Sequence, residues 1–199
     1  MTHGTPPRLR GILFDRDGTL VVDVPFNAEP SRVAPLPTAA QAVRRARGAG
    51  LRTGVATNQP GIATGELRPA DLASVNARID ALVGPFDDWF VCPHAKGAGC
   101  ACRKPRPGLI EQAARRWGVE PCEFALIGDT QADLGAAAAA GAVGVLVPNE
   151  RTLPDEVQRA ALCAGTLLEA VELLLGRGTR AGTDSAARDA DAAFAGVRR

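Results

Sequence analysis

Short apolar runs alternate along the chain with longer segments in which apolar residues recur every three or four positions. The apolar runs are rich in branched and aromatic side chains and predict five strands, at residues 11–14, 52–56, 89–92, 124–127 and 143–147. The longer segments predict helices at residues 38–48, 69–82, 107–117, 131–140 and 166–175. This alternation is typical of an α/β fold, a three-layer Rossmann-like parallel sheet with helices on both faces.

The predicted elements fill one domain, from residue 1 to residue 176. Neither residues 21–36 nor residues 59–89 leave room for an inserted cap domain, because the first stretch has no long helical pattern and one crossover helix uses the second. Residues 177–199 are rich in Gly, Ala, Asp and Arg and hold few large apolar side chains, so we expect a flexible C-terminal tail there.

Composition narrows the class of protein. The chain has 199 residues, 46% of them hydrophobic, and a formal net charge of +1. This balance allows one sizeable core and gives no basic excess for binding nucleic acid or a membrane surface. No apolar run is long enough for a secretory or membrane-spanning helix. We therefore expect a cytoplasmic monomer with neither nucleic-acid nor membrane partners.

Two carboxylates follow the first predicted strand. Asp15 and Asp17 are two residues apart, so they leave the strand end on the same side, and Gly18 allows a sharp turn behind them. Such close like charges favour a divalent cation bound by oxygens, most naturally Mg²⁺, with one carboxylate free to attack and the other to move protons. A solvated Asp-rich turn is the alternative interpretation of this segment alone.

Three further groups of polar residues follow later predicted strands or lie in loops. Thr57 and Asn58 offer a hydroxyl and an amide suited to phosphate oxygens. Arg103 and Lys104 are two adjacent cations suited to phosphate charge. Asp129 and Asp133 are two more carboxylates. Taken singly, these could be a turn, a solvated loop and a helix N-terminal charge. The carboxylates fall at strand C-termini, where open α/β sheets bind ligands.

A compact group of sulfur and imidazole ligands precedes the two cations. Three thiols and one imidazole lie at close spacing, at Cys92, His94, Cys100 and Cys102. They form the ligand set of a closed tetrahedral Zn²⁺ site, which would be structural because no coordination position stays open. Disulfides or unrelated buried thiols are the alternative, although Cys100 and Cys102 are too close to pair easily. Cys122 and Cys163 lie outside the group, and we expect ordinary small buried residues there.

The order of these motifs resembles that of the haloacid dehalogenase superfamily, over residues 10–148. The cysteine cluster makes the chain most similar to its small capless phosphatases, which act on heptose bisphosphate or histidinol phosphate. The resemblance implies phosphomonoester hydrolysis through an aspartyl-phosphate, with Asp15 as nucleophile and Asp17 as general acid and base. It also implies Mg²⁺ bound by the carboxylates of Asp15 and Asp129 and by the main-chain carbonyl of Asp17.

The same resemblance assigns the remaining site residues. Thr57, Asn58 and Lys104 would hold the equatorial phosphate oxygens, Asp133 would orient Lys104 or the metal shell, and Arg103 would reach a distal phosphate or hydroxyl. The expected substrate is a small phosphorylated metabolite, first of all D-glycero-D-manno-heptose 1,7-bisphosphate, from which the 7-phosphate would be removed. Histidinol phosphate or another small phosphorylated metabolite is the runner-up, and a non-catalytic docking module built on the zinc loop is the alternative from a different class.

Overall fold

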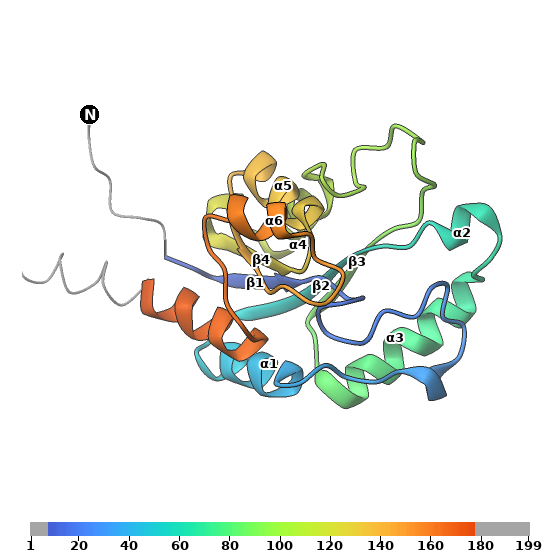
Figure 1. Cartoon of the computed structure of the whole chain (residues 1–199), viewed down its shortest axis with the longest axis horizontal. Helices are drawn as coiled ribbons and strands as arrows, with labels where there is room; N and C mark the ends of the chain where they lie inside the picture. The colour runs from blue at the N-terminus through green and yellow to red at the C-terminus, as the bar shows by residue number, and fades with distance from the viewer. Residues whose placement is uncertain (1–7, 178–199) are drawn as a thin grey trace, which may run out of the picture.

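A parallel five-stranded sheet forms the centre of the protein, described here by a computed structural model over residues 8–177 (Figure 1). Its strand order is β3-β2-β1-β4-β5 and every neighbouring pair is parallel. The strands are β1 (Gly11–Phe14), β2 (Arg52–Asn58), β3 (Asp88–Cys92), β4 (Phe124–Gly128) and β5 (Val143–Leu146). The predicted α/β sheet is therefore confirmed.

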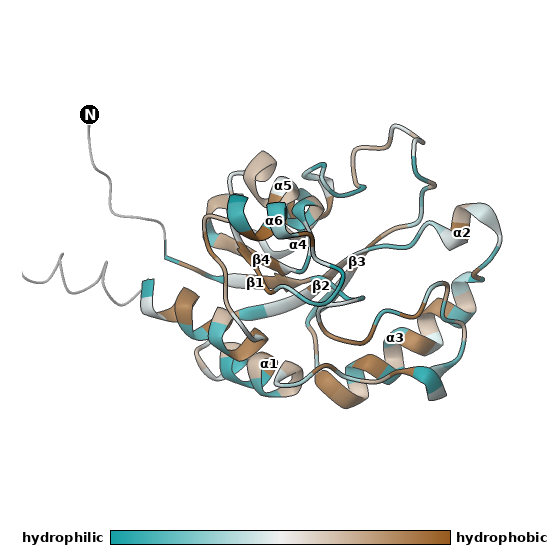
Figure 2. Cartoon of the chain, viewed as in Figure 1, coloured by the Kyte–Doolittle hydropathy of each residue, from teal (hydrophilic) through white to brown (hydrophobic). Residues whose placement is uncertain are grey.

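Helices cover both faces of this sheet. One face carries α1 (Ala39–Gly48), α3 (Pro69–Val83) and a last helix over residues 167–177, while the other carries α4 (Gly108–Trp117) and α5 (Gln131–Ala140). In Figure 2 apolar and polar residues alternate along α1 and α3, as expected for helices that bury one side only. Gly118 and Gly141 end α4 and α5 with positive φ angles of 63° and 76°.

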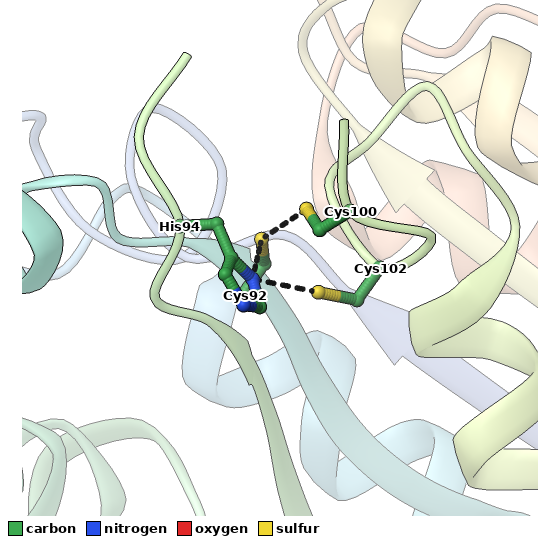
Figure 3. A group of neighbouring side chains, drawn as sticks. All are labelled: Cys92, His94, Cys100 and Cys102. Carbon is green, nitrogen blue, oxygen red and sulfur yellow. Dashed lines mark hydrogen bonds between the residues drawn. The ribbon is translucent and has the colours of Figure 1, made fainter. Parts of the chain in front are cut away.

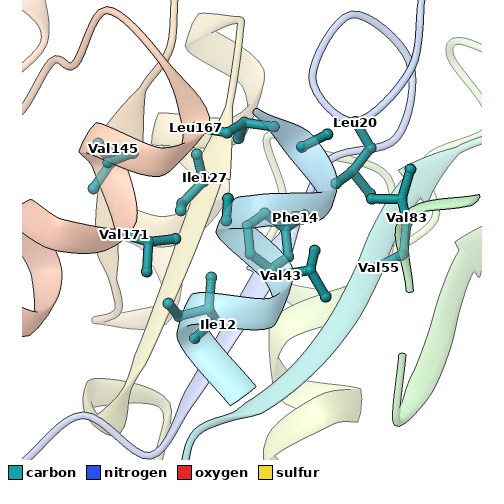
Figure 4. Packing of buried hydrophobic residues seen from close by; sticks show 14 of the residues in the cluster. Ile12, Phe14, Leu20, Val43, Val55, Val83, Ile127, Val145, Leu167 and Val171 are labelled. Carbon is teal, nitrogen blue, oxygen red and sulfur yellow. The ribbon is translucent and has the colours of Figure 1, made fainter. Parts of the chain in front are cut away.

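The two cores follow from the alternation of side chains along β1. Ile12 and Phe14 point to the face covered by α1, α3 and the last helix, whereas Leu13 points to the face covered by α4 and α5. Figure 4 shows Ile12 and Phe14 among branched side chains from both helices and strands, including Val43 and Val171. All three β1 side chains are fully buried, so each contributes about 1.5–3 kcal/mol of hydrophobic stabilisation.

Some details differ from the sequence-based expectation. Strand β2 continues to Asn58, two residues past the predicted end, and the short helices α2 (Gly61–Thr64) and α6 (Pro154–Arg159) were not predicted. Helices this short show no apolar period. The prediction that Cys122 and Cys163 are buried was wrong: both are exposed, because one lies in a 3₁₀ turn before β4 and the other in an irregular segment beyond β5.

The segments that could have held a cap are short. The connection from β1 to α1 contains one 3₁₀ turn, at Pro30–Arg32, and the connection from β2 to β3 contains α2 and α3. No inserted cap domain is present in residues 8–177. In the same range, none of the helices has the length and apolar character needed to cross a membrane. The predicted tail lies outside the described residues from residue 178 on, and the domain limits stay a prediction.

Candidate active site and metal-binding cluster

The predicted acidic residues meet at the carboxyl edge of the sheet. Asp15 directly follows β1, and its main-chain N–H donates to the carbonyl oxygen of Ile127 at 2.8 Å. Asp129 directly follows β4, which pairs with β1. The chain leaves β1 toward β2 and β3 and later returns to β4 on the other side of β1. The two carboxylates therefore stand at the topological switch point, where open α/β sheets bind ligands.

Lys104 lies at the centre of the acidic residues. Its Nζ donates to Asp15 Oδ1 at 2.7 Å, to Asp133 Oδ1 at 2.6 Å and to the carbonyl oxygen of Ala56 at 2.8 Å. The Lys104 and Asp133 side chains are only 3% and 1% exposed, and that of Asp15 is 13% exposed. All three ammonium protons are thus used in a nearly dry environment, which makes these bonds strong and directional.

One ammonium does not balance this group of carboxylates. Burial and the charges of Asp133 and Asp129 raise the pKa of Asp15 to about 8, although Lys104 acts in the opposite direction. Burial and the Asp133 charge likewise raise the pKa of Asp129. For Lys104, burial lowers the pKa, but the carboxylates of Asp133 and Asp15 outweigh burial and raise it above its usual value. The site therefore favours a further cation.

Two glycines permit the close approach of the acidic residues. Gly18 has a φ of +78°, and a Cβ there would lie 2.5 Å from Asp129 Oδ2. A Cβ on Gly128 would lie 2.2 Å from Cγ of Asp133. Asp133 also caps α5, since its Oδ2 accepts from the main-chain N–H and the hydroxyl of Thr130 at 3.2 and 2.7 Å. One carboxylate thus starts the helix and holds Lys104.

The Asp17 carboxylate is held from two sides. Arg16 donates from Nε to Oδ1 at 3.0 Å and from a terminal nitrogen to Oδ2 at 2.9 Å, and a further N–H reaches Asn76 Oδ1 at 3.1 Å. Gln59 Nε2 donates to Asp17 Oδ2 at 2.8 Å and to Thr57 Oγ1 at 2.9 Å. Asp17 and the buried Thr57 hydroxyl therefore share one amide donor, which fixes them side by side.

The other two predicted phosphate-binding residues meet the segment that carries Lys104, Asn58 from the end of β2 and Arg103 as its chain neighbour. Asn58 Nδ2 donates to the carbonyl oxygen of Lys104 at 3.2 Å, and Asn58 Oδ1 accepts from its N–H at 3.1 Å. Asn58 thereby positions Lys104 and keeps one amide N–H for another acceptor. Arg103 is half-buried and donates to the carbonyl oxygen of His94 at 3.3 Å. The structure thus places Arg103 against the cysteine loop.

Several residues of the site were not predicted from the sequence. Thr19 Oγ1 donates to Asp129 Oδ1 at 3.2 Å, and Asn149 Nδ2 donates to Asp129 Oδ2 at 2.7 Å. Thr152 Oγ1 donates to the main-chain oxygen of Asp129 at 2.7 Å. Thr19 lies beside the first acidic pair and could have been singled out. The other two follow β5 with no charge or metal-ligand spacing to mark them.

The three thiols and the imidazole converge in space (Figure 3). Cys92 Sγ lies 3.6 Å from His94 Nδ1 and 3.7 Å from Cys100 Sγ, and Cys102 Sγ lies 3.2 Å from His94 Nδ1. Ligands about 2.0–2.3 Å from a tetrahedral Zn²⁺ are separated from one another by roughly 3.5–3.8 Å. The donor types and their separations therefore fit one zinc ion.

The ionisation of these thiols also calls for a cation. Burial and the neighbouring sulfurs of Cys92 and Cys100 raise the pKa of Cys102 to about 12. Three adjacent thiols cannot all ionise without a compensating positive charge, and a bound metal supplies it. A four-residue ligand set leaves no open coordination position, so this cluster fits a structural metal.

The second possible metal group consists of hard oxygen donors. Carboxylate oxygens of Asp15, Asp129 and Asp133 all lie within 4.8 Å of one another. Asp133 has one oxygen on Lys104 and the other on Thr130. Asp15 meets Lys104 through one oxygen only, and the Asp129 carboxylate meets only neutral side-chain donors, so these two are the candidate ligands. Carboxylate oxygens with few competing nitrogen donors suit Mg²⁺ rather than Zn²⁺. The excess negative charge around Lys104 agrees with a divalent cation here.

Comparisons with known proteins agree with this geometry. The family model of haloacid dehalogenase-like hydrolases matches residues 24–141, more than half of the chain. A Pseudomonas putida protein named D-glycero-beta-D-manno-heptose-1,7-bisphosphate 7-phosphatase is 37% identical over 161 residues, 76% of this chain and 91% of the relative. A Bordetella bronchiseptica protein of the same name is 38% identical over 141 residues, 68% of this chain and 79% of the relative.

A solved structure shows the same fold. The D,D-heptose 1,7-bisphosphate phosphatase from Bordetella bronchiseptica, complexed with magnesium and phosphate, superimposes with a TM-score of 0.74 at 33% identity. The alignment covers 84% of this chain and 99% of that structure. The family match covers more than half of the chain, and the relatives are aligned over most of their own length. Both findings agree with a hydrolase site at the carboxyl edge of the sheet. The chain therefore belongs to the haloacid dehalogenase-like hydrolases.

Proposed function

We propose that this protein is a Mg²⁺-dependent phosphatase that removes the 7-phosphate of D-glycero-D-manno-heptose 1,7-bisphosphate. The Pseudomonas putida and Bordetella bronchiseptica relatives carry the beta anomer in their names, so the beta anomer is the proposed substrate. The observation that carries the catalytic part is the position of the Lys104 ammonium, 2.7 Å from Asp15 and 2.6 Å from Asp133 at the switch point of the sheet.

The first half of the reaction uses Asp15 as nucleophile. A carboxylate oxygen of Asp15 would attack phosphorus in line with the bond to the sugar oxygen, which breaks to give an aspartyl-phosphate and an alkoxide. Asp17 would donate its proton to that alkoxide. In the structure both Asp17 oxygens accept from Arg16 and Gln59, so proton delivery needs one of these bonds to exchange for the substrate oxygen.

The second half reverses the role of Asp17. Its carboxylate would take a proton from water, which attacks the phosphorus of the aspartyl-phosphate, releases inorganic phosphate and restores Asp15. Mg²⁺ held by the Asp15 and Asp129 carboxylates and the Asp17 carbonyl would reduce the repulsion between the nucleophile and the phosphate. Thr57 and the free N–H of Asn58 are the proposed donors to the equatorial oxygens, and Lys104 would neutralise their charge.

Substrate selection is assigned to loops because residues 8–177 contain no cap. Arg103 lies beside Lys104 on the cysteine loop, where its guanidinium can turn from the His94 carbonyl to a distal phosphate. The Zn²⁺ held by the four-residue cluster would keep this loop in place and take no part in the chemistry. Cytoplasmic location and a monomeric state remain predictions from the sequence.

The experiment is a measurement of phosphate release in the presence of Mg²⁺ from each anomer of the heptose bisphosphate. Histidinol phosphate and fructose 1,6-bisphosphate are tested separately as alternative substrates. We expect the highest kcat/KM for the beta anomer, and ³¹P NMR should show that the phosphate on carbon 7 is lost. Preference for the alpha anomer would correct the anomer only. Preference for histidinol phosphate would retain the mechanism and overturn the substrate.

The control for the chemistry is Asp15→Asn. This change keeps the side-chain shape but removes the nucleophile, so turnover should fall to background while the circular dichroism spectrum stays unchanged. Phosphate release by the folded Asp15→Asn protein would overturn the proposed mechanism. Absence of turnover with every compound would favour the alternative in which the cysteine loop is a docking module.

A further inference from the structure

The loop after β5 meets the active site through one amide. Asn149 Nδ2 donates to Asp129 Oδ2 at 2.7 Å and to the carbonyl oxygen of Gly18 at 2.9 Å. These acceptors belong to the loops after β4 and β1, 20 and 131 residues away along the chain. A single side chain therefore ties together the two loops that carry the proposed metal ligands.

We propose that Asn149 is a positioning residue, which holds the Asp129 carboxylate in the orientation needed for Mg²⁺ and fixes the loop of Asp17 against it. This inference rests on the proposed function, because Asp129 matters as a ligand of the catalytic cation. It assigns a role in metal affinity to a residue outside the four motifs recognised in the sequence.

The orientation of the Asn149 amide is determined by its neighbours. Its Oδ1 accepts from the main-chain N–H of Arg151 at 2.8 Å, so its nitrogen must face Asp129 and Gly18. Both amide protons then have acceptors. The main-chain N–H of Asn149 donates in turn to Thr152 Oγ1 at 2.9 Å, and that hydroxyl donates to the main-chain oxygen of Asp129.

The hydrogen-bond donors around the Asp129 carboxylate leave its charge available to a metal ion. Asn149 binds one oxygen of the Asp129 carboxylate and Thr19 binds the other, at 2.7 and 3.2 Å. Both donors are neutral, so they restrict rotation of the carboxylate without neutralising the charge that attracts a cation. Asp133 differs, because its charge is already paired with Lys104 at 2.6 Å. Residues that orient a metal ligand in this way commonly change metal affinity by about 10–100-fold when they are removed.

The loop that carries Asn149 has its own attachments. Arg151 forms an ion pair with Asp23, in the segment after β1. Thr152 and the main chain of Asn149 complete a closed set of hydrogen bonds over Asp129. Besides the Asn149 amide, the loop is thus tied to the segments after β1 and β4 at two points, so truncating the amide should leave the loop in place.

The test is Mg²⁺ binding to Asn149→Ala and to Asn149→Leu, measured by isothermal titration calorimetry without substrate. Alanine removes the amide and leucine replaces it with a side chain of similar volume and no donor. We expect the Kd for Mg²⁺ to rise about 10-fold or more in both variants. We also expect the activity of both variants to recover at high Mg²⁺. The Mg²⁺ concentration for half-maximal rate should therefore rise by a larger factor than the one by which kcat at saturating Mg²⁺ falls.

Glu150→Gln is the matched control. Glu150 is the next residue of the same loop and is exposed, so this variant should bind Mg²⁺ like the unaltered protein. Thr152→Val is a second variant that removes the link to the Asp129 main chain but keeps the Asn149 amide, and we expect a smaller rise in Kd. If the Asn149 variants fail to fold, Thr152→Val still tests whether this loop positions Asp129, and an unchanged Kd would then count against the positioning role.

The outcomes separate this inference from the proposed function. Unchanged Mg²⁺ affinity in folded Asn149 variants, or an equal loss in Glu150→Gln, would overturn the positioning role. If the unaltered protein binds Mg²⁺ but hydrolyses no phosphomonoester, the proposed function fails while the binding comparison still decides the role of Asn149. Absence of Mg²⁺ binding at millimolar concentration in the unaltered protein would overturn both.

Discussion

Asp15 should be a destabilising residue when the metal is absent. It is one of three carboxylates around a single ammonium, and its side chain is 13% exposed. Burial and two neighbouring carboxylates raise its pKa from an ordinary 3.8 to about 8. As the proposed nucleophile, Asp15 would be ready for a phosphate and a cation, and its charge would cost stability until they bind. Asp15→Asn should therefore stabilise the Mg²⁺-free protein at alkaline pH while abolishing turnover.

The sign of the pH dependence follows from linkage. Because the pKa of Asp15 is higher in the folded protein than in the unfolded chain, folding takes up a proton. The associated stabilisation is complete below pH 3.8 and is lost as the pH rises toward 8. A pKa rise of this size limits the effect to roughly 6 kcal/mol. The raised pKa already includes the opposing attraction of Lys104, and we expect a net gain within this limit, about 1–3 kcal/mol at pH 8.5.

The assay is urea unfolding followed by tryptophan fluorescence after dialysis into magnesium-free buffer. The buffer contains no chelator, so that the cysteine cluster keeps its metal. The gain in unfolding free energy should shrink as the pH falls toward 5, and added Mg²⁺ should stabilise the unaltered protein more than the variant. Asp155→Asn is the control, because its carboxylate is 72% exposed and its replacement should change stability by less than about 0.5 kcal/mol. A variant less stable at pH 8.5, or a gain equal at pH 5 and 8.5, would refute the reasoning.

Three other predictions concern the surroundings of Asp15. Lys104→Met leaves Asp15 and Asp133 unpaired and should lower the unfolding free energy by about 3–5 kcal/mol, most at high pH, in the same urea titration. Gly18→Ala forces a Cβ to within 2.5 Å of Asp129 Oδ2 at a φ of +78°, so kcat should fall more than ~10-fold in phosphate-release assays, and an unchanged rate would contradict the close approach. Cys100→Ser should reduce the zinc measured by mass spectrometry from one ion per chain to a small fraction and lower the melting temperature in calorimetry, whereas full zinc retention would exclude this ligand set.

The sequence predicted the fold because each strand is a short apolar run between helical patterns. It also predicted where the acidic residues meet, since the carboxyl ends of parallel strands share one edge of the sheet. Asp15 and Asp129 are far apart in the chain and adjacent in space for this reason alone. The contact of Asp133 with Lys104 agrees with the orienting role expected from the resemblance.

The rest of the site depends on pairings that no local pattern marks. Arg16 is only 2% exposed, although a single arginine in a sequence is normally taken as a surface residue. It is buried because Asp17 and Asn76 bind its guanidinium, and Asn76 comes from α3, 60 residues later. Gln59 and Asn149 are likewise neutral residues whose partners come from other loops. Amide side chains carry no charge pattern, so only the tertiary structure reveals their role.

The cysteine cluster is best understood through Lys104. Residues 93–107 connect β3 to α4, and all the described side chains of the loop tip at residues 96–99 are exposed. Fixing a residue without hydrophobic burial costs roughly 1–2 kcal/mol of backbone entropy. A structural zinc ion contributes on the order of 10 kcal/mol or more to the ordering of its ligands. Cys102, a member of the cluster, lies two residues before Lys104, and Asn58 makes paired hydrogen bonds with the Lys104 main chain. These two attachments hold the ammonium against Asp15 on a loop that has little core of its own. Loss of zinc should therefore weaken catalysis through Lys104, even though no ligand of the cluster belongs to the acidic site.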